Sequence, residues 1–463
     1  MNNESNGGAA DILISFYGDD FTGSTDAMEA LALNGVKTVL FLVAPTRELL
    51  ERRFAGVRAF GIAGVSRAMA TDEMERELRP IFAALRAMPS SVVHYKICST
   101  FDSSPAVGSI GRAIDVGAET FDNQPTVPLL VGAPSLRRYT LFGNHFAGVG
   151  AQTFRLDRHP TMSRHPVTPM DEADLRLHLS KQTEKSIGLM NILDLSGDEE
   201  EVKRRWSANL EAFPGVMLFD ALDEPRLERV GAILWEESNE NGMRFVVGSS
   251  GVEYALAAHW RTLGLADPEA ALLAPRGPVD RLLAVSGSCS PVTESQIRHA
   301  LAHGFVGIPV DTTRMLDESE AERLQAELAA QASNVLKDGG SPLLYTAIGP
   351  EDAAIAAMKR KLEELGLPAF DTSRLIGARL GKLTKLIVQE HRLSRFAIAG
   401  GDTSGFVTRE LGIYALEAIM PIAPGGPLCR SYADDPAFDG LELVLKGGQV
   451  GKEDFFAKVR EGK

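Results

Sequence analysis

The stretch DILISFYGDDFTGSTDAMEALALNGVKTVLFLV, residues 11–43, decides the fold of this chain. Its apolar start runs into the loop Gly18-Asp19-Asp20, a helical pattern follows from Ser24 to Asn34, and Gly35 ends that pattern before a second apolar run. Strand, Gly/Asp loop, helix, glycine and strand in this order are typical of a βαβ unit with parallel strands. The stretch therefore predicts an α/β fold.

The same pattern recurs along the whole chain. In the first half, short apolar runs that end in polar or glycine-rich loops lie at residues 92–97, 128–131, 187–195 and 244–247. In the second half, such runs lie at residues 282–285, 343–346, 396–399 and 441–445. Recurring strands with helical stretches between them predict two domains, each with a largely parallel sheet flanked by helices.

A change in composition marks the boundary between the two domains. Around residues 267–278 the chain becomes rich in Ala, Pro and Gly, which is typical of a linker. A chain of 463 residues also fits two domains, because a domain usually holds roughly 100–200 residues. We expect a disordered tail, an N-terminal domain, a linker and a C-terminal domain at residues 1–10, 11–270, 271–280 and 281–463.

Composition and charge argue against several classes of protein. The net charge of −14 disfavours nucleic-acid binding, which usually needs a basic face. Three widely spaced cysteines form neither a disulfide framework nor a paired metal motif, which favours a reducing cytoplasm. The N-terminus has no signal-peptide pattern, and no run approaches the ~18 apolar residues of a membrane helix. We expect a cytoplasmic enzyme with no nucleic-acid or membrane partner.

The strongest local signal is the loop GGDTSG at residues 400–405, which lies between an apolar run and a helical pattern. A helix that starts directly after a buried strand presents free N–H groups and its positive dipole end, and both favour an anion. Glycines let a phosphate approach the backbone, while Thr403 or Ser404 could cap the helix or contact the phosphate. The alternative is a tight strand–helix turn without a ligand.

Two further loops in the second half strengthen the phosphate interpretation. Ser286-Gly287-Ser288 follows one apolar run, and KGGQVG at residues 446–451 follows another. Ligands of open parallel sheets bind beyond the carboxyl ends of the strands, so three such loops predict one shared nucleotide site. None of them matches the Walker pattern or GxGxxG, which disfavours a P-loop NTPase and a standard dinucleotide fold.

The first half gathers acidic residues at the end of its first strand. Asp19 and Asp20 lie where neither packing nor ordinary capping explains a pair of acids, so we predict that they bind substrate hydroxyls or accept a proton. Asp26 falls in the first helical turn, where compensation of the helix dipole explains it equally well.

Cations follow other strands of the same half. Lys96 lies near the end of an apolar run and is followed by Ser99, while Arg138 and Arg164 lie in loops that also contain Gly, Pro and His. Forked donors of this kind recognise a carboxylate or a phosphate. The alternative for the arginines is a solvated surface.

Taken together, these motifs resemble the four-carbon acid sugar kinase family. The resemblance is carried, in the order of the family, by DDFTGSTDAMEALALNGVKTVLFL at 19–42, the segment 96–102, SGS at 286–288, GGDTSG at 400–405 and KGGQVG at 446–451, and it extends from about residue 11 to 460. It implies ATP-dependent phosphorylation of a small acid sugar such as threonate, erythronate or a 3-oxo-tetronate. It also implies that the N-terminal domain holds the acid sugar and the C-terminal domain the nucleotide, with the active site in the cleft between them.

The resemblance assigns roles to individual residues. The ATP contacts it implies are Ser288, Gly400, Gly401, Asp402, Thr403 and Gly448. The acid-sugar contacts it implies are Asp19, Asp20, Lys96, Ser99, Arg138 and Arg164. Phosphoryl transfer also needs Mg²⁺ on the phosphate oxygens and a base for the attacking hydroxyl. Asp20 and Asp402 are both candidates for the base, and no residue is assigned as a metal ligand.

The segment after Lys96 departs from the family pattern. The family pattern is nearer Lys-x-Asp-Ser-Thr-Leu-Arg-Gly, whereas here Cys98 replaces the acid and Asp102-Ser103 replaces Arg-Gly. Because these changes lie on the substrate side, a branched acid sugar such as 3-oxo-isoapionate is the alternative substrate.

Two other classes of function and two structural questions stay open at this stage. One class is an NAD-dependent dehydrogenase, which the missing GxGxxG disfavours, and the other is a non-catalytic protein that binds acid sugars. The sequence also leaves open a homodimer and a hinge closure around residues 270–280.

Overall fold

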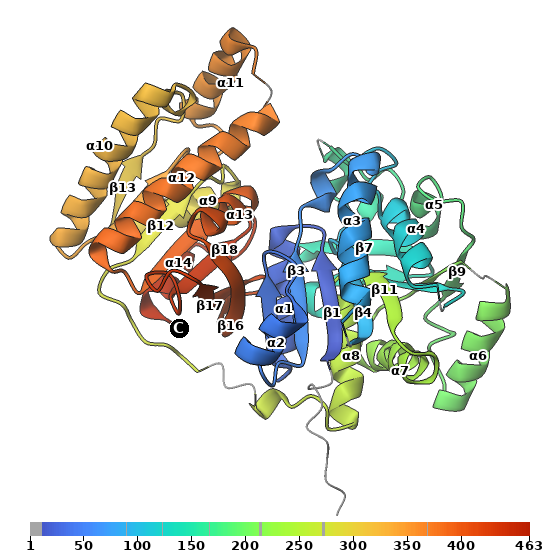
Figure 1. Cartoon of the computed structure of the whole chain (residues 1–463). Helices are drawn as coiled ribbons and strands as arrows, with labels where there is room; N and C mark the ends of the chain where they lie inside the picture. Colours follow the sequence, from blue (N-terminus) through green and yellow to red (C-terminus); the bar gives the residue numbers. More distant parts are fainter. Residues whose placement is uncertain are drawn as a thin grey trace, which may run out of the picture. The chain divides into compact units, whose positions relative to one another are not determined.

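The computed structural model describes residues 12–88, 90–122, 124–165, 167–212, 215–270, 274–367 and 369–463. The chain divides into two compact units, Met1–Leu272 and Leu273–Lys463 (Figure 1). The expected tail at residues 1–10 and the first part of the expected linker, residues 271–273, lie outside the described residues. Each unit contains its own series of neighbouring strands, and the described helices include none long and apolar enough to cross a membrane.

The N-terminal unit is built on a parallel sheet. Its strands lie in the order β2-β3-β1-β4-β11-β5-β10-β9, and all the pairs between these neighbours are parallel. In chain order they are β1 Ile12–Gly18, β2 Thr38–Phe41, β3 Ala59–Ala63, β4 Ser90–Lys96, β5 Val127–Leu130, β9 Ile187–Met190, β10 Val216–Phe219 and β11 Arg244–Gly248. The predicted βαβ unit is confirmed as β1, α1 and β2. The central strands are buried along their whole length, because helices cover both faces of a parallel sheet.

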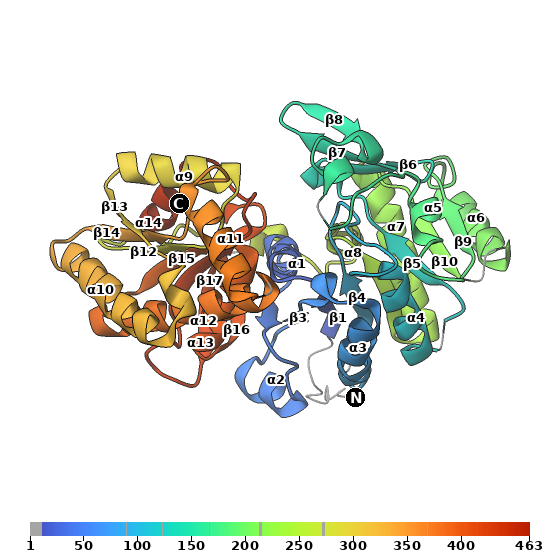
Figure 2. The ribbon, with the colours of Figure 1, turned by 90° about the horizontal axis from the view of Figure 1, so that it is seen from above.

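Eight helices of the described chain flank this sheet. They are α1 Phe21–Leu33, α2 Arg47–Arg53, α3 Thr71–Arg86, α4 Ile110–Thr120, α5 Leu175–Leu179, α6 Glu199–Ala212, α7 Glu224–Asn241 and α8 Gly251–Thr262. Helix α3 packs on α4, and α7 packs on α8 (Figure 2). The last pair approaches closely because Gly231 has no side chain: a Cβ there would lie 2.0 Å from the Ala255 carbonyl oxygen.

A small antiparallel sheet, absent from the sequence-based prediction, interrupts the N-terminal unit. Its strands are β6 Arg138–Leu141, β7 Asn144–Val149 and β8 Gln152–Arg155. Thr140 exchanges backbone hydrogen bonds with Ala221 just after β10, at 3.0 and 2.9 Å. The small sheet is therefore anchored at the carboxyl end of the large sheet, where it places Arg138.

The C-terminal unit has a mixed sheet. Its order is β13-β14-β12-β15-β18-β17-β16, parallel up to β18 and antiparallel beyond it. The strands are β12 Leu283–Ser286, β13 Phe305–Pro309, β14 Ser341–Tyr345, β15 Arg395–Ala399, β16 Ile413–Ala423, β17 Gly426–Ala433 and β18 Glu442–Lys446. The sequence did not predict the hairpin β16–β17, whose turn lies at Pro424-Gly425. The largely parallel α/β class is confirmed for both units.

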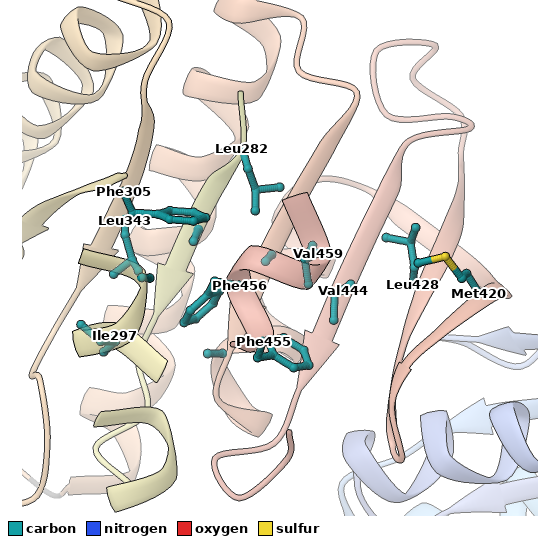
Figure 3. Packing of buried hydrophobic residues seen from close by; sticks show 14 residues of the cluster. Leu282, Ile297, Phe305, Leu343, Met420, Leu428, Val444, Phe455, Phe456 and Val459 are labelled. Atoms are coloured by element: carbon teal, nitrogen blue, oxygen red, sulfur yellow. The ribbon is translucent and has the colours of Figure 1, made fainter. Parts of the chain in front are cut away.

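Six described helices belong to this unit. They are α9 Pro291–Ala302, α10 Glu318–Lys337, α11 Ala353–Leu365, α12 Ala369–His391, α13 Gly401–Glu410 and α14 Phe455–Glu461. Of these, α9 and α14 contribute residues to the core of the unit. Figure 3 shows Phe455, Phe456 and Val459 of α14 packed with Ile297 of α9 and Val444 of β18. This packing ties the end of β18 to the start of α9, and the candidate nucleotide loops lie there.

Candidate functional site

The three loops predicted to bind a nucleotide lie side by side. Strands β12, β15 and β18 are neighbours in the parallel part of the sheet, so their carboxyl ends meet at one edge. The Gly287 N–H donates to the Ala399 carbonyl at 2.9 Å, and the Gly400 N–H donates to the Lys446 carbonyl at 2.9 Å. The edge thus joins the loops at 286–288, 400–405 and 446–451.

Glycines allow these loops to touch one another. A Cβ at Gly287 would lie 2.1 Å from Thr403 Oγ1, and a Cβ at Gly448 would lie 2.8 Å from Ser288 Oγ. Gly400 adopts φ 123°, a conformation that side chains disfavour. The glycines therefore serve the contact between loops, a reason that the sequence did not reveal.

Helix α13 begins without a side-chain cap, contrary to the suggestion that Thr403 or Ser404 could provide one. Gly400 is the N-cap, and the Ser404 hydroxyl donates back to the Gly400 carbonyl at 2.7 Å. Asp402 is exposed in the first turn, next to Gly401. Uncapped N–H groups at a helix start attract an anion, and this favours the phosphate interpretation over a plain capped turn.

A cavity of about 260 Å³ opens beside these loops. Gly287, Asp402 and Thr403 form one side of it. The remaining lining is mostly apolar and includes Ala347, Ala354, Ile355, Met358, Ile376 and Leu380. The turn at residues 424–427 does not line this cavity.

Sequence reasoning missed Lys446, although it opens the third loop. Its side chain is buried, and Nζ donates to Thr293 Oγ1 and to the Gly447 carbonyl, both at 3.0 Å. Burial lowers the pKa of Lys446 to about 8. A lysine at the end of a strand that otherwise reads LELVL was the signal that could have identified it.

In the N-terminal unit, the two predicted acids are held by an arginine that the sequence analysis did not single out. Arg67 follows β3, the neighbour of β1, and donates to both carboxylate oxygens of Asp19 at 2.6 and 3.1 Å. Its Nη2 also lies 2.8 Å from Asp20 Oδ1. Burial raises the pKa of Asp19, and the charge of Arg67 opposes this effect. We call these three residues the acid–arginine cluster.

Asp19 and Asp20 differ in whether a carboxylate oxygen remains without a hydrogen-bond donor among the described residues. Both oxygens of Asp19 bond to Arg67, and the side chain is almost wholly buried. Contrary to the expectation that capping does not explain these acids, Asp20 is the N-cap of α1: its Oδ1 accepts the Gly23 N–H at 2.7 Å and also meets Arg67. Within the described residues, Asp20 Oδ2 has no hydrogen-bond donor, so it is the free oxygen of the pair.

Lys96 lies beside the acid–arginine cluster at the end of β4. Its Nζ is 3.4 Å from Asp26 Oδ2 and 3.1 Å from the Ile97 carbonyl oxygen. Burial alone would lower the pKa of Lys96, but nearby carboxylates, Asp26 foremost, raise it. Gly23 makes room for this ammonium, since a Cβ there would lie 3.2 Å from Nζ. Asp26 therefore has a charged partner, and the expected place in the first turn is wrong, because α1 begins at Phe21 and Asp26 lies beyond its first turn.

Arg138 is a half-buried cation of this region that has no carboxylate partner among the described residues. Its Nη1 donates to the carbonyls of Leu136, Arg137 and Gly148 at 3.0, 3.3 and 3.3 Å. Across the described ranges no carboxylate lies within ion-pair distance of it. Burial lowers the pKa of Arg138, while Cys98, Asp102 and Asp26 are near enough to raise it. Since Thr140 of β6 bonds to Ala221 just after β10, Arg138 at the start of β6 lies near the carboxyl ends of the large sheet.

The residues that depart from the family pattern also lie at this edge. Cys98 Sγ is 3.0 Å from Thr100 Oγ1, which donates to Asp102 Oδ1 at 2.7 Å. Burial raises the pKa of Cys98 to about 11, so the thiol is neutral at pH 7. Ser99 uses its carbonyl to meet His145 Nε2 at 2.8 Å, and its side chain is half-buried.

The structure thus gathers most of the predicted residues at two strand edges, one in each unit. Arg164 is the exception, because it is the exposed last residue of the short 3-10 turn Met162–Arg164, and no contact joins it to the cluster in the part of the chain that is described. The candidate residues of the first unit form charged pairs, and those of the second unit lie in glycine-rich loops.

Comparison with known proteins gives both units a counterpart. Residues 14–256 match the family described as a sugar-binding N-terminal domain, and residues 283–456 match that described as a nucleotide-binding C-terminal domain. A 3-oxo-isoapionate kinase of Paraburkholderia graminis is 46% identical over 454 residues, covering 98% of this chain and 95% of the relative. A 3-oxo-tetronate kinase of Pectobacterium atrosepticum is 29% identical, covering 97% of this chain and 99% of the relative.

Solved structures agree with these sequence matches. A protein of Salmonella typhimurium LT2 superposes with a TM-score of 0.78 at 26% identity, covering 98% of this chain and all of its own, 100%. A Haemophilus influenzae protein superposes with a TM-score of 0.70 at 25% identity, covering 96% of this chain and 98% of its own.

Proposed function

The chain belongs to the four-carbon acid sugar kinase family, and we propose that the substrate of this kinase is the branched acid sugar 3-oxo-isoapionate. The supporting observation is the 46% identity to a 3-oxo-isoapionate kinase over nearly the whole chain, against 30% or less to the 3-oxo-tetronate kinases. Cys98, which departs from the family pattern, adds support because it is near enough to Arg67 of the acid–arginine cluster for each to affect the pKa of the other. A four-carbon 3-oxo-tetronate is the second candidate.

Arg138 is the residue we propose for the carboxylate of the acid sugar. It has no carboxylate partner of its own within the described residues, and a guanidinium binds a carboxylate through two parallel hydrogen bonds. Lys96, Asp19 and Ser99 lie at neighbouring strand ends, where their polar groups would contact the hydroxyls or the carbonyl. Arg164 stays a prediction as a weaker contact at the rim.

We propose Asp20 as the base that accepts the proton of the attacking hydroxyl. Its Oδ2 carries no hydrogen bond from the described residues, whereas Oδ1 is held by the Gly23 N–H and by Arg67. A base needs one oxygen free and the carboxylate fixed in position. Asp19 lacks the free oxygen. Asp402 remains the second candidate, because it lies at the phosphate loop rather than among the substrate groups.

The nucleotide is proposed to lie at the glycine-rich loops. The first turn of α13 would hold the phosphates with its N–H groups, together with Ser288, Thr403 and Gly448. The apolar cavity beside them, about 260 Å³, is suited to the base of the nucleotide.

Mg²⁺ fits this arrangement. The ion usually keeps water and phosphate ligands and needs only one or two carboxylates from the protein. Asp402 is exposed at the phosphate loop and lines the cavity, so we propose that it helps to hold the ion. When bound, Mg²⁺ neutralises charge on the phosphate oxygens.

A coupled assay of ADP release tests the proposed substrate. The enzyme is assayed with ATP and a panel of 3-oxo-isoapionate, 3-oxo-tetronates, threonate and erythronate. We expect the highest kcat/KM with 3-oxo-isoapionate. A higher kcat/KM with any four-carbon acid overturns the substrate, and no ADP release with any member overturns the reaction itself.

Three further statements are proposals about the cell and the assembly. We place the enzyme in the cytoplasm, where ATP and intermediates of sugar catabolism are available. A homodimer is tested by the mass from light scattering. The expected domain closure around residues 270–280 is tested by small-angle scattering with an ATP analogue and the acid sugar together, and it is wrong if the radius of gyration does not fall.

A further inference from the structure

We propose that Lys446 is the positioning cation of the nucleotide site: through Thr293 it orients the Ser288 hydroxyl toward the ATP phosphates, and its charge attracts them. This inference deepens the proposed function, since it assumes that the loops at 286–288 and 446–451 bind ATP. Neither the motifs nor the family resemblance assigned Lys446 a role.

The fold buries Lys446 beneath the loops. Residues alternate between the two faces of β18, so Lys446 points to the same face as Val444, toward α9 and α14. Its Nζ lies 5.7 Å from the centroid of the Phe455 ring, and the residue is 1% exposed. Val444 and Phe455 belong to the core shown in Figure 3, which fixes the position of the lysine.

The hydrogen bonds of Lys446 have only one direction. An ammonium donates and never accepts, so Thr293 Oγ1 must accept from Nζ at 3.0 Å. The Thr293 hydroxyl then uses its own proton on Ser288 Oγ or on the Gly448 carbonyl, both at 3.0 Å. The Gly448 carbonyl already accepts from the Ser290 hydroxyl. Since Ser290 already satisfies this carbonyl, we assign the Thr293 proton to Ser288 Oγ.

Ser288 is therefore left as a donor. Its oxygen accepts from Thr293 Oγ1 at 3.0 Å and lies 3.4 Å from the Ser290 backbone nitrogen. Its own proton has no acceptor among the described residues and is free for an oxygen of the ligand. A phosphate accepts hydrogen bonds only, so this polarity suits ATP.

The charge of Lys446 also lacks a partner within the protein. Three other buried cations of the described chain each have a carboxylate: Lys96 has Asp26 at 3.4 Å, Arg244 has Glu237 at 3.1 Å and Arg395 has Glu442 at 2.9 Å. No carboxylate of the described residues lies within ion-pair distance of Lys446. A buried charge without a counter-charge is unfavourable, and a bound phosphate would supply one.

The missing counter-charge makes ATP binding depend on pH. The groups that pack on Lys446 are Thr293 from α9, Phe455 from α14 and the Gly447 carbonyl, none of which titrates near neutral pH. Burial alone lowers the pKa of Lys446 to about 8, and a bound phosphate would raise it. The free protein loses this proton as the pH rises through about 8, so ATP affinity should fall above that pH.

Calorimetric titration with a non-hydrolysable ATP analogue and with adenosine tests the proposal between pH 7 and 9.5. Lys446→Met should weaken analogue binding by about 10-fold to 100-fold at pH 7, the effect of one charged hydrogen-bond network, and should abolish the fall above pH 8. Adenosine affinity should change by less than about twofold. Lys382→Met, an exposed lysine of α12, is the matched control and should match the wild type.

A second variant separates the relay from the charge. Thr293→Val should weaken analogue binding while keeping the fall above pH 8, because Lys446 and its charge remain. The proposal is overturned if Lys446→Met binds the analogue as the wild type does, or if it loses adenosine and the analogue equally. If the wild type itself binds no analogue, the proposed function fails instead.

Discussion

The two strand-end sites balance charge in opposite ways. In the N-terminal unit, acids and cations pair with one another: Arg67 joins Asp19 and Asp20, and Lys96 meets Asp26. In the C-terminal unit, the edge consists mainly of glycine backbone around Lys446, which has no carboxylate partner within the described residues. The first site has its side chains fixed in position by ion pairs, whereas the second leaves a positive edge for an anion.

This difference agrees with the two tasks of a kinase. An acid sugar offers hydroxyls in several directions, so the protein must fix acceptors and donors around it. A nucleotide offers phosphates, which backbone N–H groups and one cation can bind without a closely fitted set of side chains. Substitutions among the charged residues of the first site should therefore affect turnover and the KM for the acid sugar. Substitutions that crowd the glycine loops should affect the KM for ATP.

The largest effect is expected from Asp20→Asn. If Asp20 is the base, kcat should fall by about 100-fold to 10,000-fold, because the amide cannot accept the proton, while binding of the ATP analogue stays unchanged. Steady-state kinetics measure kcat, and calorimetry measures binding of the ATP analogue. Asp402→Asn serves as the comparison variant, and we expect it to raise the KM for Mg-ATP. Wild-type turnover in Asp20→Asn would transfer the role of the base to another group.

Arg67→Met removes the cation of the acid–arginine cluster and should lower the free energy of unfolding. The variant leaves two carboxylates without their cation, at a cost of ~2–4 kcal/mol in the free energy of unfolding, less than for a fully buried pair because Arg67 is partly exposed. Burial already raises the pKa of Asp19, and the loss of Arg67 would raise it further. The native state then holds the Asp19 proton more tightly than the unfolded state does, so the variant loses stability as the pH rises through that pKa.

Urea unfolding of Arg67→Met from pH 4 to 8 checks this prediction. The deficit against the wild type should be larger at pH 8 than at pH 4, where Asp19 gains its proton in the native state. Arg52→Met, which removes an exposed pair with Glu48 in α2, is the control and should cost less than ~1 kcal/mol at both pH values. A deficit that does not change with pH contradicts the account of the cluster.

Arg138→Ala tests recognition of the substrate without touching the nucleotide side. The KM for the acid sugar should rise by about 10-fold to 100-fold, the equivalent of ~1.5–3 kcal/mol for a hydrogen bond between charged groups. The KM for ATP should stay the same. Arg158→Ala removes an exposed neighbouring arginine that pairs with Asp157 and serves as the control. An unchanged KM in Arg138→Ala would place the carboxylate elsewhere, with Arg164 as the next variant.

The smallest effect is expected from Gly287→Ala, which crowds the glycine loops. A Cβ there would lie 2.1 Å from Thr403 Oγ1, so α13 must shift at a cost of ~1–2 kcal/mol in stability, and the KM for ATP should rise by a few-fold. Denaturant unfolding and kinetics at varied ATP measure the two effects. Adding Thr403→Ala should restore part of the lost stability, and no restoration would contradict the crowding.

Much of the fold was accessible from the sequence because buried parallel strands are short apolar runs that end in glycine or polar loops. Residues 11–43, 92–97 and 396–399 all follow this rule, and their strands are confirmed. The sheet β6–β8 was missed because its strands are short and few of their residues are buried. The hairpin β16–β17 was missed because its largely apolar strands resemble the parallel ones in composition.

The candidate residues divide in the same way. Glycine and acid motifs at strand ends are visible in sequence, since the backbone and the charge must lie where the strand stops. Arg67 and Lys446 are single residues without a motif, and only the neighbouring strands bring them to Asp19 and to Ser288.

By itself, the amino-acid sequence determined the α/β class, the loops after the strands and the acid sugar kinase resemblance, because these depend on local order along the chain. Only the tertiary structure decided which polar groups come into contact. Arg67, which follows β3, pairs with Asp20, which follows β1, and Lys446 at the end of β18 donates to Thr293 in α9. Ion pairs and hydrogen bonds act over a few ångströms, and such distances between remote residues exist only once the sheets have formed.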